Sequence, residues 1–348
     1  MGTAIAAVFL RAGVSVLIYD NAPDFQTRTA TLLWEQYLPS RFDPANRSNA
    51  LTHPDGPCPW QESGFVRLTD QLSDLADCEL VIESIVEKID VKEDLYRRLE
   101  PILQPDCLVG TNTSTIPLSA LDSAWQNPDR FCGIHFLHPV RHRQLTEIVQ
   151  GPKSSLKTVQ LAASIMRAVG QRPLPVRSCP GFVVNRLLHP YINEGLKLLK
   201  EGADMDEIDE AAVEFGMAWG PIKTMDEIGI DVVLNSGKVL FEAFPDRIDV
   251  SPILISLYKS KCWGVKSGQG FRIYDGSERN KKSLDWRRWI EKTQDFDKAE
   301  IARRLIAPMV EEGRRILAEG IVDSSEQIET AVCDGLAFPR NKLPFLGK

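Results

Sequence analysis

Short apolar segments alternate with helical segments through the first half of this 348-residue chain. Strands that alternate with helices usually form a parallel sheet, because each parallel pair needs a crossover connection. The order therefore predicts a doubly wound α/β sheet, in which ligands bind at the carboxyl ends of the strands. The predicted strands cover residues 14–19, 65–68, 80–83, 107–110 and 130–135.

The pattern changes near residue 179, after which only helices and one glycine-rich turn with a short strand are predicted. Residues Arg186–Gly195 align with Arg304–Gly313, which indicates a duplicated helical unit. We therefore expect three parts: an α/β domain at 1–178, a helical domain at 179–278 and a second helical repeat at 296–348. The predicted helices cover 183–201, 205–215 and 224–244, with the turn at 264–274 and a charged linker at 275–295.

An amphipathic helix is also predicted in the first domain, at residues 87–103. Four apolar residues recur every fourth position and should form its buried face. They are Val91, Leu95, Leu99 and Leu103.

The N-terminal segment is predicted to form a helix and then a strand that ends at an acidic residue. This order is typical of the second half of a dinucleotide-binding βαβ unit. Asp20 would accept hydrogen bonds from a ribose diol, and Gly2 corresponds to the last glycine of a GxGxxG loop. The preceding strand and glycines are missing from the sequence. We therefore expect a start that lies about 10–20 residues late, the length of a strand plus loop. Such a chain should bind its dinucleotide weakly and tend to aggregate, and an added upstream strand ending in Gly-x-Gly should restore binding and prevent aggregation.

A histidine-rich segment follows the strand at 130–135, and a second predicted strand carries Glu147. Adjacent strands would bring His135 and Glu147 face to face, and a histidine backed by a carboxylate is a general base. Two other interpretations are a buried structural histidine and a metal site with His138 and His142. Pro139 prevents the three histidines from sharing a helix face. The common position of Glu83, residues 111–115 and His135 at strand ends favours a functional histidine over a structural one.

Composition narrows the classes of function. The net charge of −7 and the lack of a long basic run argue against nucleic-acid binding. No apolar run is long enough for a membrane span. The seven cysteines form no CxxC pair, so we expect reduced thiols in a cytoplasmic protein.

Several motifs in order and spacing resemble the L-3-hydroxyacyl-CoA dehydrogenases, the NAD-dependent enzymes of fatty-acid β-oxidation. The resemblance runs from Gly2 to about Tyr274, and the second helical copy resembles the tail of the dehydrogenase part in multifunctional β-oxidation proteins. The motifs are Val81–Glu87 with Lys92, Asn112–Thr115, Gly133–Val140, Leu145–Val149, Pro180–Arg186, Gly220–Pro221 and Gly264–Tyr274.

The resemblance implies NAD as cofactor and acyl-CoA as substrate, with a homodimer or an association with other β-oxidation enzymes. It makes His135 and Glu147 the catalytic dyad and implies that Ser114 and Asn185 hydrogen-bond the substrate oxygen or the histidine. The implied cofactor residues are Gly2, Asp20, Glu87, Lys92, Asn112 and Ser114; no metal is implied.

One departure lies beside the catalytic histidine, His135. The family usually has Asn where this chain has His138, so we expect substrate range or rate to differ. Two alternatives stay open at this stage. One is a dehydrogenase of a non-CoA 3-hydroxy acid, and the other is a catalytically impaired relative that still binds NAD.

Overall fold

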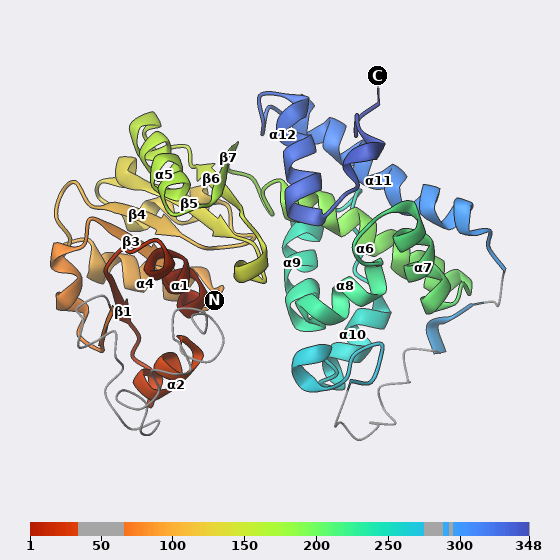
Figure 1. Ribbon diagram of the computed structural model, residues 1–348, viewed down its shortest axis with the longest axis horizontal. Coiled ribbons are helices and arrows are strands. Elements are labelled where there is room, and N and C mark those ends of the chain that lie inside the picture. Colours follow the sequence, from red (N-terminus) through yellow and green to blue (C-terminus); the bar gives the residue numbers. More distant parts are fainter. Residues whose placement is uncertain (34–65, 275–287, 292–294, 348) are drawn as a thin grey trace, which may run out of the picture. The chain divides into compact units, whose positions relative to one another are not determined.

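The chain divides into two compact units in the computed structural model, which describes residues 1–33, 66–274, 288–291 and 295–347 (Figure 1). Unit 1 comprises Met1–Thr113 and Leu118–Pro175, and unit 2 comprises Ser114–Pro117 and Val176–Lys348. Unit 1 is an α/β unit and unit 2 is helical, so the predicted fold class is confirmed. The division of the helical part at 179–278 and 296–348 stays a prediction, and the expected linker falls largely outside the described residues.

The described strands of unit 1 form two sheets. Strands β1 (Val16–Tyr19) and β2 (Val66–Thr69) pair in parallel. In the larger sheet β3 (Leu80–Glu83), β4 (Leu108–Thr111) and β5 (Phe131–Phe136) are parallel, and β6 (Leu145–Gln150) runs antiparallel to β5. Within the described ranges no ladder of hydrogen bonds joins β1 to β3. The larger sheet has the order β3, β4, β5, β6 and β7 (Arg172–Arg177).

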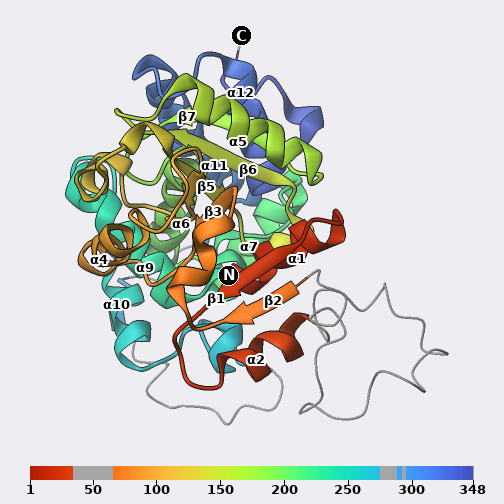
Figure 2. The same cartoon turned by 90° about the vertical axis from the view of Figure 1, so that its left-hand side faces the viewer.

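Helices cover both faces of the larger sheet. Apolar side chains of α1 (Gly2–Arg11) and α5 (Leu156–Ala168) pack on one face, against Cys132, Ile134 and Phe136. Because successive strand residues point to opposite faces, Phe131 and His135 face the other side. There Tyr96 of α4 (Ile89–Leu99) stacks on Trp125 with ring centroids 4.9 Å apart and meets Phe131 at 5.4 Å. Figure 2 shows α2 (Phe25–Leu32) beside the smaller sheet.

The buried face of α4 differs from the one predicted. Val91 is 38% exposed, whereas Lys92, Tyr96 and Leu99 are buried. The prediction is confirmed for Leu99 and Leu103, which are buried, and is wrong for Val91. It counted only apolar residues, whereas Lys92 and Tyr96 turn inward to hydrogen-bond Glu83 on β3.

Unit 2 is built from seven described α-helices. The predicted single helix at 224–244 is wrong, because Gly229 separates α8 (Pro221–Ile228) from α9 (Ile230–Ala243). Its φ of 104° is a conformation that residues with a Cβ rarely adopt. The helices are α6 (Val184–Glu201), α7 (Met205–Phe215), α8, α9, α10 (Pro252–Lys259), α11 (Lys298–Ala318) and α12 (Ser325–Thr330).

The repeated segments become α6 and α11, which pack against each other. Each carries an internal proline, Pro190 and Pro308, at the aligned position. The aligned arginines make reciprocal ion pairs, each with two glutamates of the other copy. This exchange of equivalent contacts is the signature of an approximate two-fold relation between the copies. The pairs are Arg186 with Glu312 and Glu319, and Arg304 with Glu194 and Glu201.

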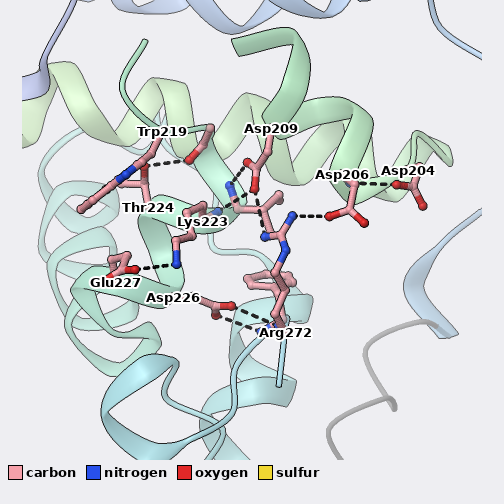
Figure 3. A network of polar contacts seen from close by, with 12 residues as sticks. Asp204, Asp206, Asp209, Trp219, Lys223, Thr224, Asp226, Glu227 and Arg272 are labelled. Carbon is pink, nitrogen blue, oxygen red and sulfur yellow. Dashed lines mark hydrogen bonds and ion pairs between the residues drawn. The ribbon is translucent and has the colours of Figure 1, made fainter. Parts of the chain in front are cut away.

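The glycine-rich turn is fastened to two helices by buried carboxylates (Figure 3). Asp226 of α8 accepts hydrogen bonds from the backbone N–H groups of Phe271 at 2.9 Å and Arg272 at 3.1 Å. Arg272 pairs in turn with Asp209 of α7 at 2.9 Å. A Cβ on Gly270 would overlap the Asp226 carboxylate, so this close approach requires glycine. The turn therefore holds α7 and α8 together.

Candidate functional site

The β5–β6 hairpin places His135 directly opposite Glu147 in an antiparallel register, as the sequence predicts. Their side chains meet at 2.6 Å, from Nδ1 to Oε2. Both are buried, at 4% and 0% exposure. An ionised carboxylate only accepts, so Nδ1 carries the proton and Nε2 is the nitrogen that can take one up.

Asn112 ties the loop after β4 to the end of β5. Its side-chain Oδ1 accepts a hydrogen bond from the N–H of Phe136 at 2.8 Å, and its own N–H donates to the carbonyl of Glu83 at 2.8 Å. Asn112 was predicted to lie near a cofactor. The structure shows it supporting the strand end beside His135.

Glu87 and Lys92 lie together in the same unit, at the carboxyl end of β3. The Lys92 ammonium is 2.7 Å from Glu83 and 3.3 Å from Glu87. Glu83 was not among the predicted site residues. Its signal was visible in the sequence as an acid at the end of a buried strand, followed by a lysine and a tyrosine spaced four residues apart on one face of the next helix.

Asp20 follows β1 and keeps a side chain that is 38% exposed. Its carboxylate accepts from the N–H of Ala22 at 2.9 Å and pairs with Arg28 at 3.5 Å. Gly2 begins α1, where a Cβ would stand 3.7 Å from Ser84, beyond the end of β3.

These groups fit a dinucleotide. Half-exposed carboxylates such as Asp20 and Glu87 can accept hydrogen bonds from ribose hydroxyls. The start of α1 has no side-chain cap, and the N–H groups of such a helix end suit a pyrophosphate.

Ser114 and Asn185 belong to unit 2. The Asn185 side-chain N–H donates to the backbone carbonyl of Ser114 at 2.8 Å, and the N–H of Gly181 donates to Thr115 at 3.2 Å. The residues at 114–117 are thereby docked on the segment that leads into α6. Unit 1 holds the predicted pair His135 and Glu147, and unit 2 holds the pair Ser114 and Asn185.

The histidine-based metal site gains no support from the geometry. His135 is engaged with Glu147, and His142 Nε2 accepts a hydrogen bond from Arg141 at 2.7 Å. Over the described ranges, no group of three or more His, Cys, Asp or Glu side chains has an arrangement that could hold a metal ion.

Two protein-family models together match most of the chain. Residues 1–179 match the NAD-binding domain of 3-hydroxyacyl-CoA dehydrogenase, and residues 181–274 match its C-terminal domain. The chain belongs to the 3-hydroxyacyl-CoA dehydrogenase family. Family membership confirms NAD as the cofactor of unit 1.

A curated relative agrees with the family assignment. This chain is 34% identical over 293 residues to the fatty acid oxidation complex subunit alpha of Psychrobacter arcticus, and the match covers 81% of this chain and 40% of that protein. The chain thus spans less than half the length of this curated relative.

Two solved structures share the fold. A 3-hydroxybutyryl-CoA dehydrogenase from Escherichia coli superposes with a TM-score of 0.80 at 23% identity, over 97% of this chain and 87% of that one. The dehydrogenase part of multifunctional enzyme 1 from C. elegans superposes with a TM-score of 0.64 at 26% identity, over 97% of this chain and 76% of that one. None of the described helices is both long and apolar enough to cross a membrane.

Proposed function

We propose that this chain catalyses the NAD-dependent oxidation of L-3-hydroxyacyl-CoA to 3-oxoacyl-CoA in fatty-acid β-oxidation. The observation that carries the proposal is the buried pair of His135 and Glu147, joined at 2.6 Å in a chain of this family. A buried carboxylate that orients an imidazole is the arrangement required of a general base.

In the proposed reaction NAD supplies the acceptor for the hydride that leaves C3 of the substrate. His135 takes the proton of the 3-hydroxyl group through Nε2, and the C–O bond becomes a carbonyl. Glu147 keeps the imidazole in the tautomer with hydrogen on Nδ1 and stabilises the imidazolium that forms. In the reverse direction His135 returns the same proton to the carbonyl oxygen.

Ser114 and Asn185 are proposed to act on the substrate oxygen or on the histidine. The Asn185 side chain donates to the backbone of Ser114, which supports a role in holding the serine hydroxyl in place. A neutral donor at the substrate oxygen stabilises the polarised carbonyl in the reverse reaction.

The proposed cofactor-binding residues belong to unit 1, apart from Ser114. Asp20 is assigned to the adenosine ribose and Glu87 to the region near the nicotinamide. The start of α1 at Gly2 is assigned to the pyrophosphate. Lys92 and Asn112 are assigned to the same cofactor site, behind Glu87 and at the end of β5, and Ser114 completes the proposed set.

The proposal extends to partners and location. A relative with 34% identity is named as a subunit of a fatty acid oxidation complex, which supports association with other β-oxidation enzymes. A homodimer is the competing possibility, and size-exclusion chromatography with light scattering separates the two. The described cysteines are free thiols, in keeping with a cytoplasmic enzyme.

The activity is tested by NADH-linked reduction of acetoacetyl-CoA. The wild-type chain should turn over, and His135→Ala should lower kcat by about 10²–10⁴-fold, the contribution typical of a general acid–base residue. The free acid, acetoacetate, serves as the second substrate. Faster reduction of the free acid would assign a non-CoA hydroxy acid, and NADH binding without turnover on either substrate would identify an impaired relative.

A further inference from the structure

The carboxylate of Glu83 lies buried at the last position of β3, with a side chain 1% exposed. Its Oε1 accepts from Lys92 Nζ at 2.7 Å and from the N–H of Ile85 at 2.7 Å. Its Oε2 accepts from the Tyr96 hydroxyl at 2.5 Å and from the Thr111 hydroxyl at 2.7 Å. Four donors use the whole accepting capacity of a carboxylate. Burial and then the Glu83 charge hold the pKa of Tyr96 well above its ordinary value, so this hydroxyl stays a donor.

A second carboxylate completes a closed ring of contacts. Lys92, whose side chain is 1% exposed, stands between Glu83 and Glu87, and Glu87 also accepts from the Thr113 hydroxyl at 2.6 Å. The N–H of Thr113 donates at 3.2 Å to the hydroxyl of Thr111, which itself donates to Glu83. The ring therefore joins the loop after β3 to the loop after β4.

The side chains of Lys92 and Glu87 differ in how far they are exposed to solvent. The Lys92 ammonium is enclosed by protein, whereas the Glu87 side chain is 36% exposed. Glu87 is thus the member that can meet a ligand at the strand ends, and Lys92 is the member that holds it. The sequence alone predicts both residues near the cofactor and does not distinguish these two positions.

We propose that Glu83 is a positioning residue for NAD: it fixes Lys92 and Thr111 so that Glu87 and the loop at 111–113 are held ready for the cofactor. The inference rests on the proposed function of unit 1 as the NAD-binding part of the enzyme. Lys92 acts on the cofactor through Glu87. A glutamine at position 83 would replace one accepting oxygen by an NH₂ group that faces donors, and it would remove the charge that Lys92 pairs with.

The test measures NADH binding by fluorescence titration of the full chain, without an acyl-CoA. Glu83→Gln should raise the NADH Kd by about tenfold or more, the effect of losing one charged hydrogen bond. At saturating NADH its kcat should stay within about threefold of wild type, because the reacting groups are untouched. Lys92→Met and Glu87→Gln should raise the Kd in the same way.

Glu100→Gln is the matched control. Glu100 lies at the C-terminal end of α4, the helix that carries Lys92. It accepts backbone hydrogen bonds from Gln126 at 2.7 Å and Asn127 at 2.8 Å, outside the ring. The Glu100→Gln variant should have a lower melting temperature and an unchanged NADH Kd. A Glu83→Gln variant that loses stability but keeps the wild-type Kd would show a purely structural role and overturn the proposal.

Should Glu83→Gln fail to fold, the double variant Glu83→Gln/Lys92→Met removes both buried charges together. It should fold and still bind NADH about tenfold more weakly, because Glu87 has lost its support. Wild-type affinity in the double variant also overturns the proposal. Since no acyl-CoA is present, failure of the substrate assignment leaves these results unaffected.

Discussion

The hydrogen bond between His135 and Glu147 decides which nitrogen of the imidazole can take up a proton. Glu147 is 0% exposed, and its Oε2 lies 2.6 Å from Nδ1. With hydrogen held on Nδ1, Nε2 is the accepting nitrogen. The proposed proton transfer therefore depends on Glu147 as much as on His135.

Glu147→Gln should show this dependence. A glutamine side chain can present its NH₂ to Nδ1, which would move the ring hydrogen to Nε2 and block proton uptake from the substrate. We expect kcat to fall by about 10²–10⁴-fold, while the NADH Kd measured without acyl-CoA stays at the wild-type value. Activity close to wild type in this variant would refute the proposed role of the pair.

Among the helices, α6 carries a second buried histidine that is unrelated to the proposed chemistry. His189 is 2% exposed, and its Nε2 lies 2.8 Å from the hydroxyl of Ser236 on α9. Burial lowers the pKa of His189 to about 4. The aligned residue of α11 is Ala307, so a histidine is not needed for this helix packing.

This histidine predicts a pH dependence of folding stability. Because its pKa is lower in the folded protein, protonation favours the unfolded chain. The stabilising contribution is fully present above the ordinary histidine pKa of about 6.5 and is lost as the pH falls towards 4. The loss between pH 7 and pH 5 should be about 2 kcal/mol.

Urea denaturation of wild type and His189→Ala at pH 7, 6 and 5 measures this contribution. The variant should be less stable at pH 7, because the substitution leaves a cavity, but its stability should fall less steeply towards pH 5. Parallel pH profiles for the two proteins would contradict the assignment.

At the scale of the whole molecule, the two helical copies are joined by reciprocal ion pairs that differ in burial. The side chain of Arg186 is 1% exposed and that of its partner Glu312 is 6% exposed. The equivalent Arg304 and Glu194 are 21% and 16% exposed. The same contact thus occurs twice, in a dry and in a wetter environment.

Methionine at each arginine should therefore have unequal effects. Arg186→Met leaves Glu312 buried without its main partner and should cost about 3–5 kcal/mol of unfolding free energy. Arg304→Met removes the more exposed pair and should cost about 1 kcal/mol or less. Urea denaturation of both variants measures the difference, and equal losses would show that burial does not control the strength of these pairs.

Periodicity and short-range spacing in the sequence were sufficient to predict the fold class and the pairing of His135 with Glu147. Alternating strands and helices predict the α/β unit, because each element's apolar pattern is local. His135 and Glu147 were paired correctly because a short hairpin sets their register. Gly229 was a visible signal for the break between α8 and α9, but its positive φ was not anticipated.

Only the tertiary structure decided which polar groups turn inward. Nothing in the spacing of α4 says that Lys92 and Tyr96 are buried while Val91 is exposed, since the answer depends on a carboxylate of another element, Glu83. The contact between Asn185 and the carbonyl of Ser114 likewise joins residues far apart in the chain. Burial of a polar group is favourable only when a partner is supplied from elsewhere, and that partner is determined by the fold as a whole.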